Sequence, residues 1–183
     1  HLWLQGFKGV LNRDATEPFT NYQKFFDGVI TNPPFGSTEA EQYDGIEITG
    51  LEHLMALRAL DTLKDKGRAA IIIGGHTQYD EMGRIKPGKN RNFFMYLHKH
   101  YSVKDVINIS GDLYSRMGTS FDIRLILIDG RKVKPDGLPP LNDPEIPVMQ
   151  PFSSKVVDTF SILFNRFKAL DFTHIFEKIK AEA

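Results

Sequence analysis

The sequence contains no cysteine, which excludes a disulfide framework and thiolate metal sites. Its longest apolar run covers residues 69–75, far short of the roughly 18 to 20 residues that a membrane span requires. It has no net charge, since 23 Lys and Arg residues balance 23 Asp and Glu residues, so an anionic partner would have to meet a local basic patch. A 183-residue chain with 41% hydrophobic residues is long enough for one globular domain with a core, and we expect it in the cytoplasm.

Strand and helix signals alternate through the first two thirds of the chain. Short apolar stretches predict strands at residues 26–31, 67–75, 103–109 and 123–128. A strand, a helix and a second strand in succession predict parallel pairing, and the last two strands follow each other without a helix, which predicts a terminal antiparallel pair. The expected fold class is therefore α/β, with a mostly parallel sheet.

Two helices are expected between these strands. The first begins with Thr49 and Glu52, which have the Thr-x-x-Glu spacing of a capping box, and closes at Lys64, Lys66 and Gly67. The second lies around residues 91–101, with aromatic and aliphatic side chains on one side.

The last third of the chain has a different composition. Residues 133–151 contain six prolines, which predicts an extended connector, taken here as residues 133–152. Residues 153–183 are expected to be helical, with an apolar stripe formed by Val156, Phe160, Leu163, Phe164, Phe167 and Leu170.

The stretch Asn32-Pro33-Pro34-Phe35 directly follows the first predicted strand. Proline has no N–H and a fixed φ, so sheet pairing must end there on a stiff backbone. Ligands of open α/β sheets bind at the carboxyl ends of strands. There the Asn32 side chain and the Pro33 carbonyl offer two acceptors that can hold an NH₂ group, and the Phe35 ring can stack on a base. A plain turn is the alternative, because X-Pro pairs end strands and Asn tolerates turn geometry.

Residues 7–132 resemble the adenine-N6 DNA methyltransferases, whose signature (Asn/Asp/Ser)-Pro-Pro-(Tyr/Phe/Trp) stands here as Asn32-Pro33-Pro34-Phe35. The form Asn-Pro-Pro-Phe-Gly is similar to that in modification subunits of restriction systems and in plasmid or phage methylases. The resemblance implies that residues 1–132 form a partial Rossmann-like class I methyltransferase sheet. It also implies S-adenosylmethionine as cofactor, double-stranded DNA as partner, and a specificity subunit or additional domains.

In this family the target adenine is flipped out of the duplex. The resemblance implies that Asn32 and the Pro33 carbonyl accept the two N6 hydrogens while the base stacks on Phe35. The nucleophile then needs no strong general base. His76 is the one nearby candidate, and an ordinary loop histidine is its simpler interpretation.

Other residues acquire candidate roles from the same resemblance. Asp14 and Ala15 fall where the family binds the adenine of the cofactor, with a turn aspartate as the alternative. Phe121 falls where the family lines the base pocket, with Thr119 or Ser120 as polar contacts, and core packing is the alternative for Phe121.

A basic loop follows the Ile-rich strand and suits DNA phosphates, although a solvated charged loop is the commoner explanation; its members are Arg84, Lys86, Lys89 and Arg91. His98 and His100 lie two residues apart on a predicted helix and so on different faces, and no metal site is expected.

The sequence lacks two features of the family's cofactor site. It contains no Gly-x-Gly, the turn that cradles the methionine end of the cofactor, and it has no obvious acidic residue for the ribose. The chain also starts at His1, so we expect a fragment of a longer protein that binds the cofactor weakly or not at all. Two other functions stay open. One is an inactive nucleic-acid-binding or assembly module of the same fold, and the other is a methylase of RNA adenine or protein glutamine.

Overall fold

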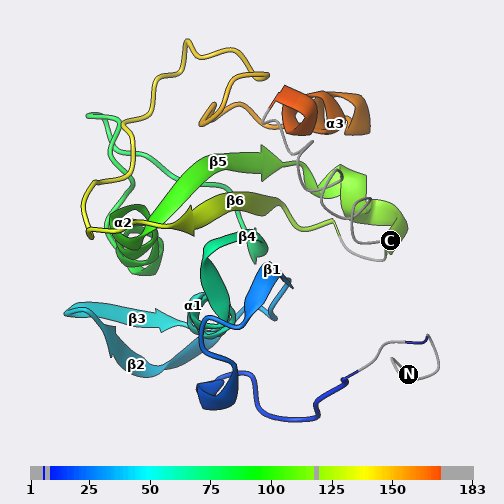
Figure 1. The fold of residues 1–183 in the computed structure, drawn as a ribbon. Coiled ribbons are helices and arrows are strands. Elements are labelled where there is room, and N and C mark those ends of the chain that lie inside the picture. Colours follow the sequence, from blue (N-terminus) through cyan, green and yellow to red (C-terminus); the bar gives the residue numbers. More distant parts are fainter. Residues whose placement is uncertain (1–5, 7–8, 118–119, 170–183) are drawn as a thin grey trace.

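The computed structural model describes residues 6, 9–117 and 120–169, and its centre is a four-stranded sheet (Figure 1). In spatial order the strands are β1 (Phe26–Thr31), β4 (Leu63–Gly74), β6 (Ile123–Arg131) and β5 (Tyr101–Ile109). β1 pairs with β4 in parallel, whereas β6 is antiparallel to both of its neighbours.

The expected α/β class and antiparallel pair are therefore confirmed. The expectation of a mostly parallel sheet is wrong, because most neighbouring strands pair antiparallel. β6 inserts between β4 and β5, so two of the three pairings are antiparallel. Because β1, β4 and β5 still run in one direction, their carboxyl ends meet at one edge of the sheet.

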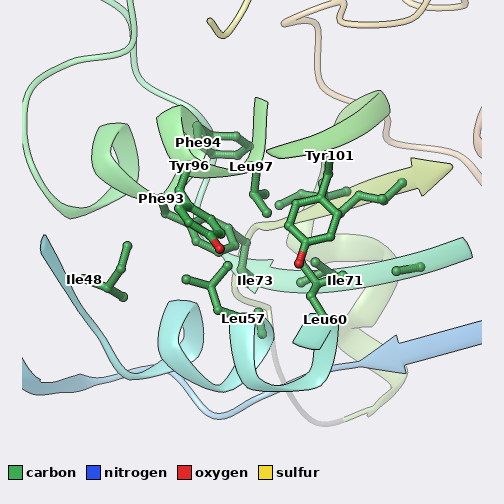
Figure 2. Close-up of a cluster of buried hydrophobic side chains, with 14 of the residues drawn as sticks. Ile48, Leu57, Leu60, Ile71, Ile73, Phe93, Phe94, Tyr96, Leu97 and Tyr101 are labelled. Carbon is green, nitrogen blue, oxygen red and sulfur yellow. The ribbon is translucent and has the colours of Figure 1, made fainter. Parts of the chain in front are cut away.

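Helices cover the two faces of the sheet unequally (Figure 1). α1 (Leu51–Asp61) and α2 (Lys89–His100) pack on one face, and α3 (Phe160–Ala169) lies on the other. Side chains alternate along β4, so Ile71 and Ile73 face α1 and α2 while Ile72 faces α3. Figure 2 shows the first cluster, in which aromatic residues of α2 close over leucines of α1.

A hairpin that the sequence analysis missed lies between β1 and α1. Its strands are β2 (Ser37–Tyr43) and β3 (Ile46–Gly50), joined at Asp44 and Gly45. Both turn residues have positive φ, 51° and 75°, the conformation that two-residue hairpin turns require and that Asp-Gly favours. The residues after the Asn-Pro-Pro-Phe stretch thus enter a strand and not a helix.

The expected capping box of α1 is wrong. Gly50 is the N-cap residue, no side chain caps the helix, and the Glu52 carboxylate turns to the backbone N–H of Gly36 instead. The helix also ends at Asp61, earlier than expected, because β4 already starts at Leu63, which pairs with Phe26.

The C-terminal region contains less helix than expected. Residues 153–159 are not helical, α3 covers Phe160–Ala169, and the remainder of the predicted helix, Leu170 included, lies outside the described residues. Of the predicted apolar stripe, Leu163 and Phe167 pack on the sheet together with Ile162, whereas the other described members are exposed: Val156, Phe160 and Phe164. None of the described helices is long and apolar enough to cross a membrane.

Short 3₁₀ helices flank the sheet strands, η2 (Thr20–Tyr22) before β1 and η3 (Gly111–Met117) after β5. The proline-rich connector forms no described helix or strand, but it is tied to the sheet. Arg166 of α3 donates to both oxygens of Asp105 in β5 at 2.6 and 2.8 Å, and the N–H of Phe152 donates to the same carboxylate at 2.7 Å.

Candidate functional site

The carboxyl edge of the sheet gathers most of the predicted site residues. Residues 32–35 leave the end of β1, the loop with His76 leaves the end of β4, and η3 leaves the end of β5. β6 starts at the same edge, where Ile123 pairs with both Gly74 and Ile109. Segments far apart in the sequence are therefore neighbours here.

Asn32 and Pro33 stand at this edge as free acceptors. Asn32 is exposed, and its side chain has no hydrogen-bond partner among the described residues. Pro33 is buried, and within the same described part of the chain its carbonyl accepts no backbone hydrogen bond. An Asn carboxamide that served only to close a turn would bond to nearby backbone. Asn32 shows no such bond among the described residues.

The Phe35 ring lies over the end of β4. It is 49% exposed, and a Cβ added at Gly74 would come within 3.0 Å of two of its ring carbons. Gly74 has no positive φ, so the position requires glycine for space and not for backbone conformation. The ring therefore lies against Gly74 of β4 and keeps substantial open surface.

Gly36, the next residue, is held by three groups. Its N–H donates to Glu52 Oε2 at 3.0 Å, and its carbonyl accepts from Lys89 Nζ at 3.1 Å and from the N–H of Leu51 at 3.2 Å. Lys89 and Glu52 also pair with each other at 3.0 Å. Burial alone would raise the pKa of Glu52, but hydrogen bonds from its own N–H, Gly36 and Lys89 outweigh it and hold the pKa below the ordinary value.

Arg124 lies beneath the same edge and is 1% exposed. It donates to the Gly74 carbonyl at 2.7 Å and to Asn90 Oδ1 at 3.0 Å, and its guanidinium lies 5.4 Å from the centre of the Phe94 ring. Burial lowers its pKa to about 10, so it remains a cation at neutral pH. It anchors the end of β4 from below.

His76 has a structural position. Its Nε2 lies 3.0 Å from the Ile109 carbonyl oxygen and its Nδ1 lies 3.6 Å from Asp122 Oδ2. The backbone carbonyl of Asp122 accepts from the N–H of Gly75 at 2.8 Å, and its carboxylate accepts from the N–H of Gly111 at 2.9 Å. The histidine thus bridges the ends of β4 and β5 to the start of β6, which favours the loop-histidine interpretation.

Of the predicted base-pocket residues, Ser120 and Phe121 are exposed just before β6, and Thr119 lies outside the described residues. Phe121 is 71% exposed, so it does not form part of the core. A Cβ at Gly111 would lie only 1.9 Å from the Ser120 carbonyl oxygen, so only glycine allows this close backbone approach.

The predicted phosphate-binding residues divide into two pairs. Arg84 is bound to Asp80 at 2.9 Å and Lys89 to Glu52, so both cations already have carboxylate partners. Lys86 is exposed, and Arg91 lines a groove of about 250 Å³ beside the proline-rich connector. Arg84 lines the same groove as Arg91, and it lines a second hollow together with Lys86, so these three cations lie near one another.

Asp14 and Ala15 are not brought to this edge. Asp14 accepts from the N–H and the hydroxyl of Thr16 at 2.9 and 2.8 Å, and these bonds hold its pKa below the ordinary value. The Thr16 carbonyl accepts from Arg58 in the last turn of α1, whereas Glu52 lies in the first turn. The turn-aspartate alternative matches this geometry.

Three supporting residues were missed as parts of the site: Glu52, Gly74 and Arg124. Glu52 was assigned to a capping box, and a lone Gly or Arg in an apolar strand gives no distinct sequence signal. The one available hint was an arginine within the run Ile123–Ile128, since a buried arginine requires specific partners.

No protein-family profile and no curated protein matches the chain. Among solved structures, the fold is similar to a chain from a study of complex assembly and conformational transition of the type I restriction-modification system. The TM-score is 0.53 and the identity 20%, over 92% of this chain and 34% of that one. This chain thus spans about a third of that chain's length, and at this identity the likeness concerns the fold alone.

Proposed function

We propose that this chain is the base-binding part of a DNA methyltransferase of a restriction-modification system, which methylates adenine at N6. The observation that supports it most is the Asn32 carboxamide, exposed and unpartnered within the described residues, on the same short segment as the Phe35 ring. The fold of the restriction-modification chain points the same way. So does the succession of β1, α1, β4, α2 and the antiparallel pair, which is the order that the resemblance implies apart from the β2–β3 hairpin inserted after β1.

In this proposal the corner formed by residues 32–35 binds an adenine that has left the duplex. Asn32 Oδ1 and the Pro33 carbonyl accept its two N6 hydrogens, while the ring of the base stacks on Phe35. Two consecutive prolines hold the acceptors in place, so little conformational entropy is lost on binding. His76 is engaged between β5 and β6, and the amine proton leaves to solvent after transfer.

S-adenosylmethionine is the methyl donor in this proposal, and the described residues do not fit its binding site. The sequence has no Gly-x-Gly, and Asp14 and Ala15 lie near the far end of α1 from the corner. We therefore assign donor binding to other parts of the protein. Isothermal titration of this chain with S-adenosylmethionine is expected to give weak or no binding, and micromolar affinity would contradict the assignment.

The test is methyl transfer by the natural full-length protein to three acceptors: double-stranded DNA, RNA and a glutamine-containing peptide. We expect N6-methyladenine in DNA by mass spectrometry, loss of product in Asn32→Ala, and retention in Asn165→Ala, which removes an exposed asparagine on α3. Transfer to RNA or peptide alone would replace the proposal by one of the other methylases. No transfer to any acceptor would favour an inactive binding or assembly module.

A further inference from the structure

The backbone of the corner, residues 32–35, has few freely rotating torsion angles, and it is held at both ends. On one side Thr31 pairs with Ile71 in the sheet, and on the other side Gly36 is held through both of its backbone polar groups. Between them, Pro33 and Pro34 have fixed φ. The orientation of the peptide between Phe35 and Gly36 therefore constrains the backbone of Phe35, from which the ring projects onto Gly74.

That peptide is oriented by a side chain from another element. Glu52 is 5% exposed in the first turn of α1, and it accepts the Gly36 N–H with one oxygen and pairs with Lys89 through the other. Lys89, the first residue of α2, donates back to the Gly36 carbonyl. The carboxylate thus links α1, α2 and the segment that follows Phe35 in one closed set of contacts.

The geometry also explains why a buried carboxylate is tolerated here. An unpaired buried charge is costly, but hydrogen bonds to the ionised form compensate for lost hydration. A Cβ at Gly36 would lie 3.3 Å from Leu51 Cδ2, so the segment is also packed tightly against the start of α1. The N-cap residue Gly50 has no side chain to cap the helix, and Glu52, besides accepting from its own N–H, reaches outside the helix to Gly36.

We propose that Glu52 is a positioning residue for the base-binding corner: its carboxylate holds the Phe35–Gly36 peptide through the Gly36 N–H, the Lys89 ammonium holds the following peptide through the Gly36 carbonyl, and together they fix the direction of the Phe35 ring. Its consequence for methyl transfer rests on the proposed function, whereas its effect on Phe35 does not.

The structural part is tested with a fluorescent reporter. Phe35→Trp in a Trp3→Phe background gives a single tryptophan, since the chain has only one. Time-resolved anisotropy is expected to show a local nanosecond motion of this reporter indole whose amplitude rises about twofold in Glu52→Ala. The amplitude stays at the reference level in Glu52→Gln, whose carbonyl can still accept the Gly36 N–H. Unchanged motion in Glu52→Ala would overturn the proposal.

Two further variants guard against a trivial outcome. Glu41→Ala removes a carboxylate that binds Arg58 at the other end of α1 and is expected to leave the reporter's motion unchanged. An increase in this control equal to that in Glu52→Ala would refute a specific role. If Glu52→Ala does not fold, Lys89→Met, at a residue 40% exposed, is expected to raise the motion to a smaller extent, and no rise would overturn the proposal.

The functional part uses the full-length protein with Phe35 intact. Glu52→Ala is expected to lower kcat about tenfold with an unchanged KM for S-adenosylmethionine, and Glu52→Gln to stay within about threefold of wild type. Equal losses in both variants would show that the charge matters and not the Gly36 contact, which would overturn the positioning role. Absence of transfer by the wild type would refute the proposed function. The positioning role of Glu52 would then be tested by the anisotropy measurements alone.

Discussion

Each face of the sheet buries a carboxylate, and the surroundings of the two differ. Asp105, on the α3 face, is fully enclosed with Arg166, and both side chains are 0% exposed. Glu52, on the α1 face, is almost as buried, but its cation Lys89 is 40% exposed. The first pair joins β5 to α3 inside the protein, whereas the second reaches the surface and holds a backbone segment there. A buried charge with an open side thus distinguishes the candidate site from a structural ion pair.

The largest effect is expected at the enclosed pair. Arg166→Met leaves Asp105 buried without its cation, which typically destabilises a protein by about 3–5 kcal/mol. Urea denaturation at neutral pH is expected to show a loss of this size. A decrease in the free energy of unfolding below about 1 kcal/mol would show that Asp105 tolerates burial without a cation. The two buried carboxylates would then no longer differ in this respect.

Acid is expected to weaken the fold through two buried histidines, one in α1 and one in α2. His53, next to Glu52, and His98, which packs near Phe152, are desolvated by burial, which lowers the pKa of each to about 4. The unfolded chain therefore binds more protons than the folded protein as pH falls from the ordinary histidine pKa toward these lowered values. The free energy of unfolding is constant above this window and falls as pH decreases through it, by up to about 3 kcal/mol per histidine.

NMR titration of the histidine rings measures these pKa values directly. Both rings are expected to remain neutral about one pH unit below the ordinary histidine pKa, and the pH dependence of stability is expected to be smaller in His53→Gln and in His98→Gln. A ring that titrates near the ordinary value would show that its side chain is solvated in the folded protein.

The smallest effect on stability is expected at Gly74. In Gly74→Ala the new methyl group would press on the Phe35 ring, which is half exposed and can move away, so the cost is about 1 kcal/mol or less. Methyl transfer is expected to fall more than stability does. Gly28→Ala in β1 is the matched control, because nothing lies within 4 Å of the added Cβ. Equal methyl-transfer activities in Gly74→Ala and Gly28→Ala would show that transfer does not depend on the position of the Phe35 ring.

The sequence predicted elements whose signal is local. Hydrophobic pattern predicted strands at residues 26–31, 103–109 and 123–128 and a helix around residues 91–101. The structure has them at Phe26–Thr31, Tyr101–Ile109, Ile123–Arg131 and Lys89–His100. The hairpin was missed although Asp44-Gly45 is a typical two-residue turn, because its strands are rich in Glu and are mostly not buried.

The candidate site also has a part with a local sequence signal and a part without one. The exposed corner was found because Asn-Pro-Pro-Phe is contiguous, whereas its support comes from residues that lie far from it in the sequence. Glu52 was assigned to a helix cap, since a capping box and a long-range bond to Gly36 look identical in sequence. Sheet order was missed for a related reason: the insertion of β6 between β4 and β5 depends on tertiary packing that periodicity does not encode.

The most direct test of the account compares single-turnover methyl transfer by wild type, Asn32→Ala and Asn32→Asp in the full-length protein. Asp keeps an acceptor oxygen at the same place, so its rate is expected to stay within about tenfold of wild type, whereas Ala is expected to lose roughly 10²–10³-fold. Folding stability should be unchanged, because the Asn32 side chain has no partner among the described residues. Equal rates for wild type and Asn32→Ala would contradict the claim that this side chain holds the target amine.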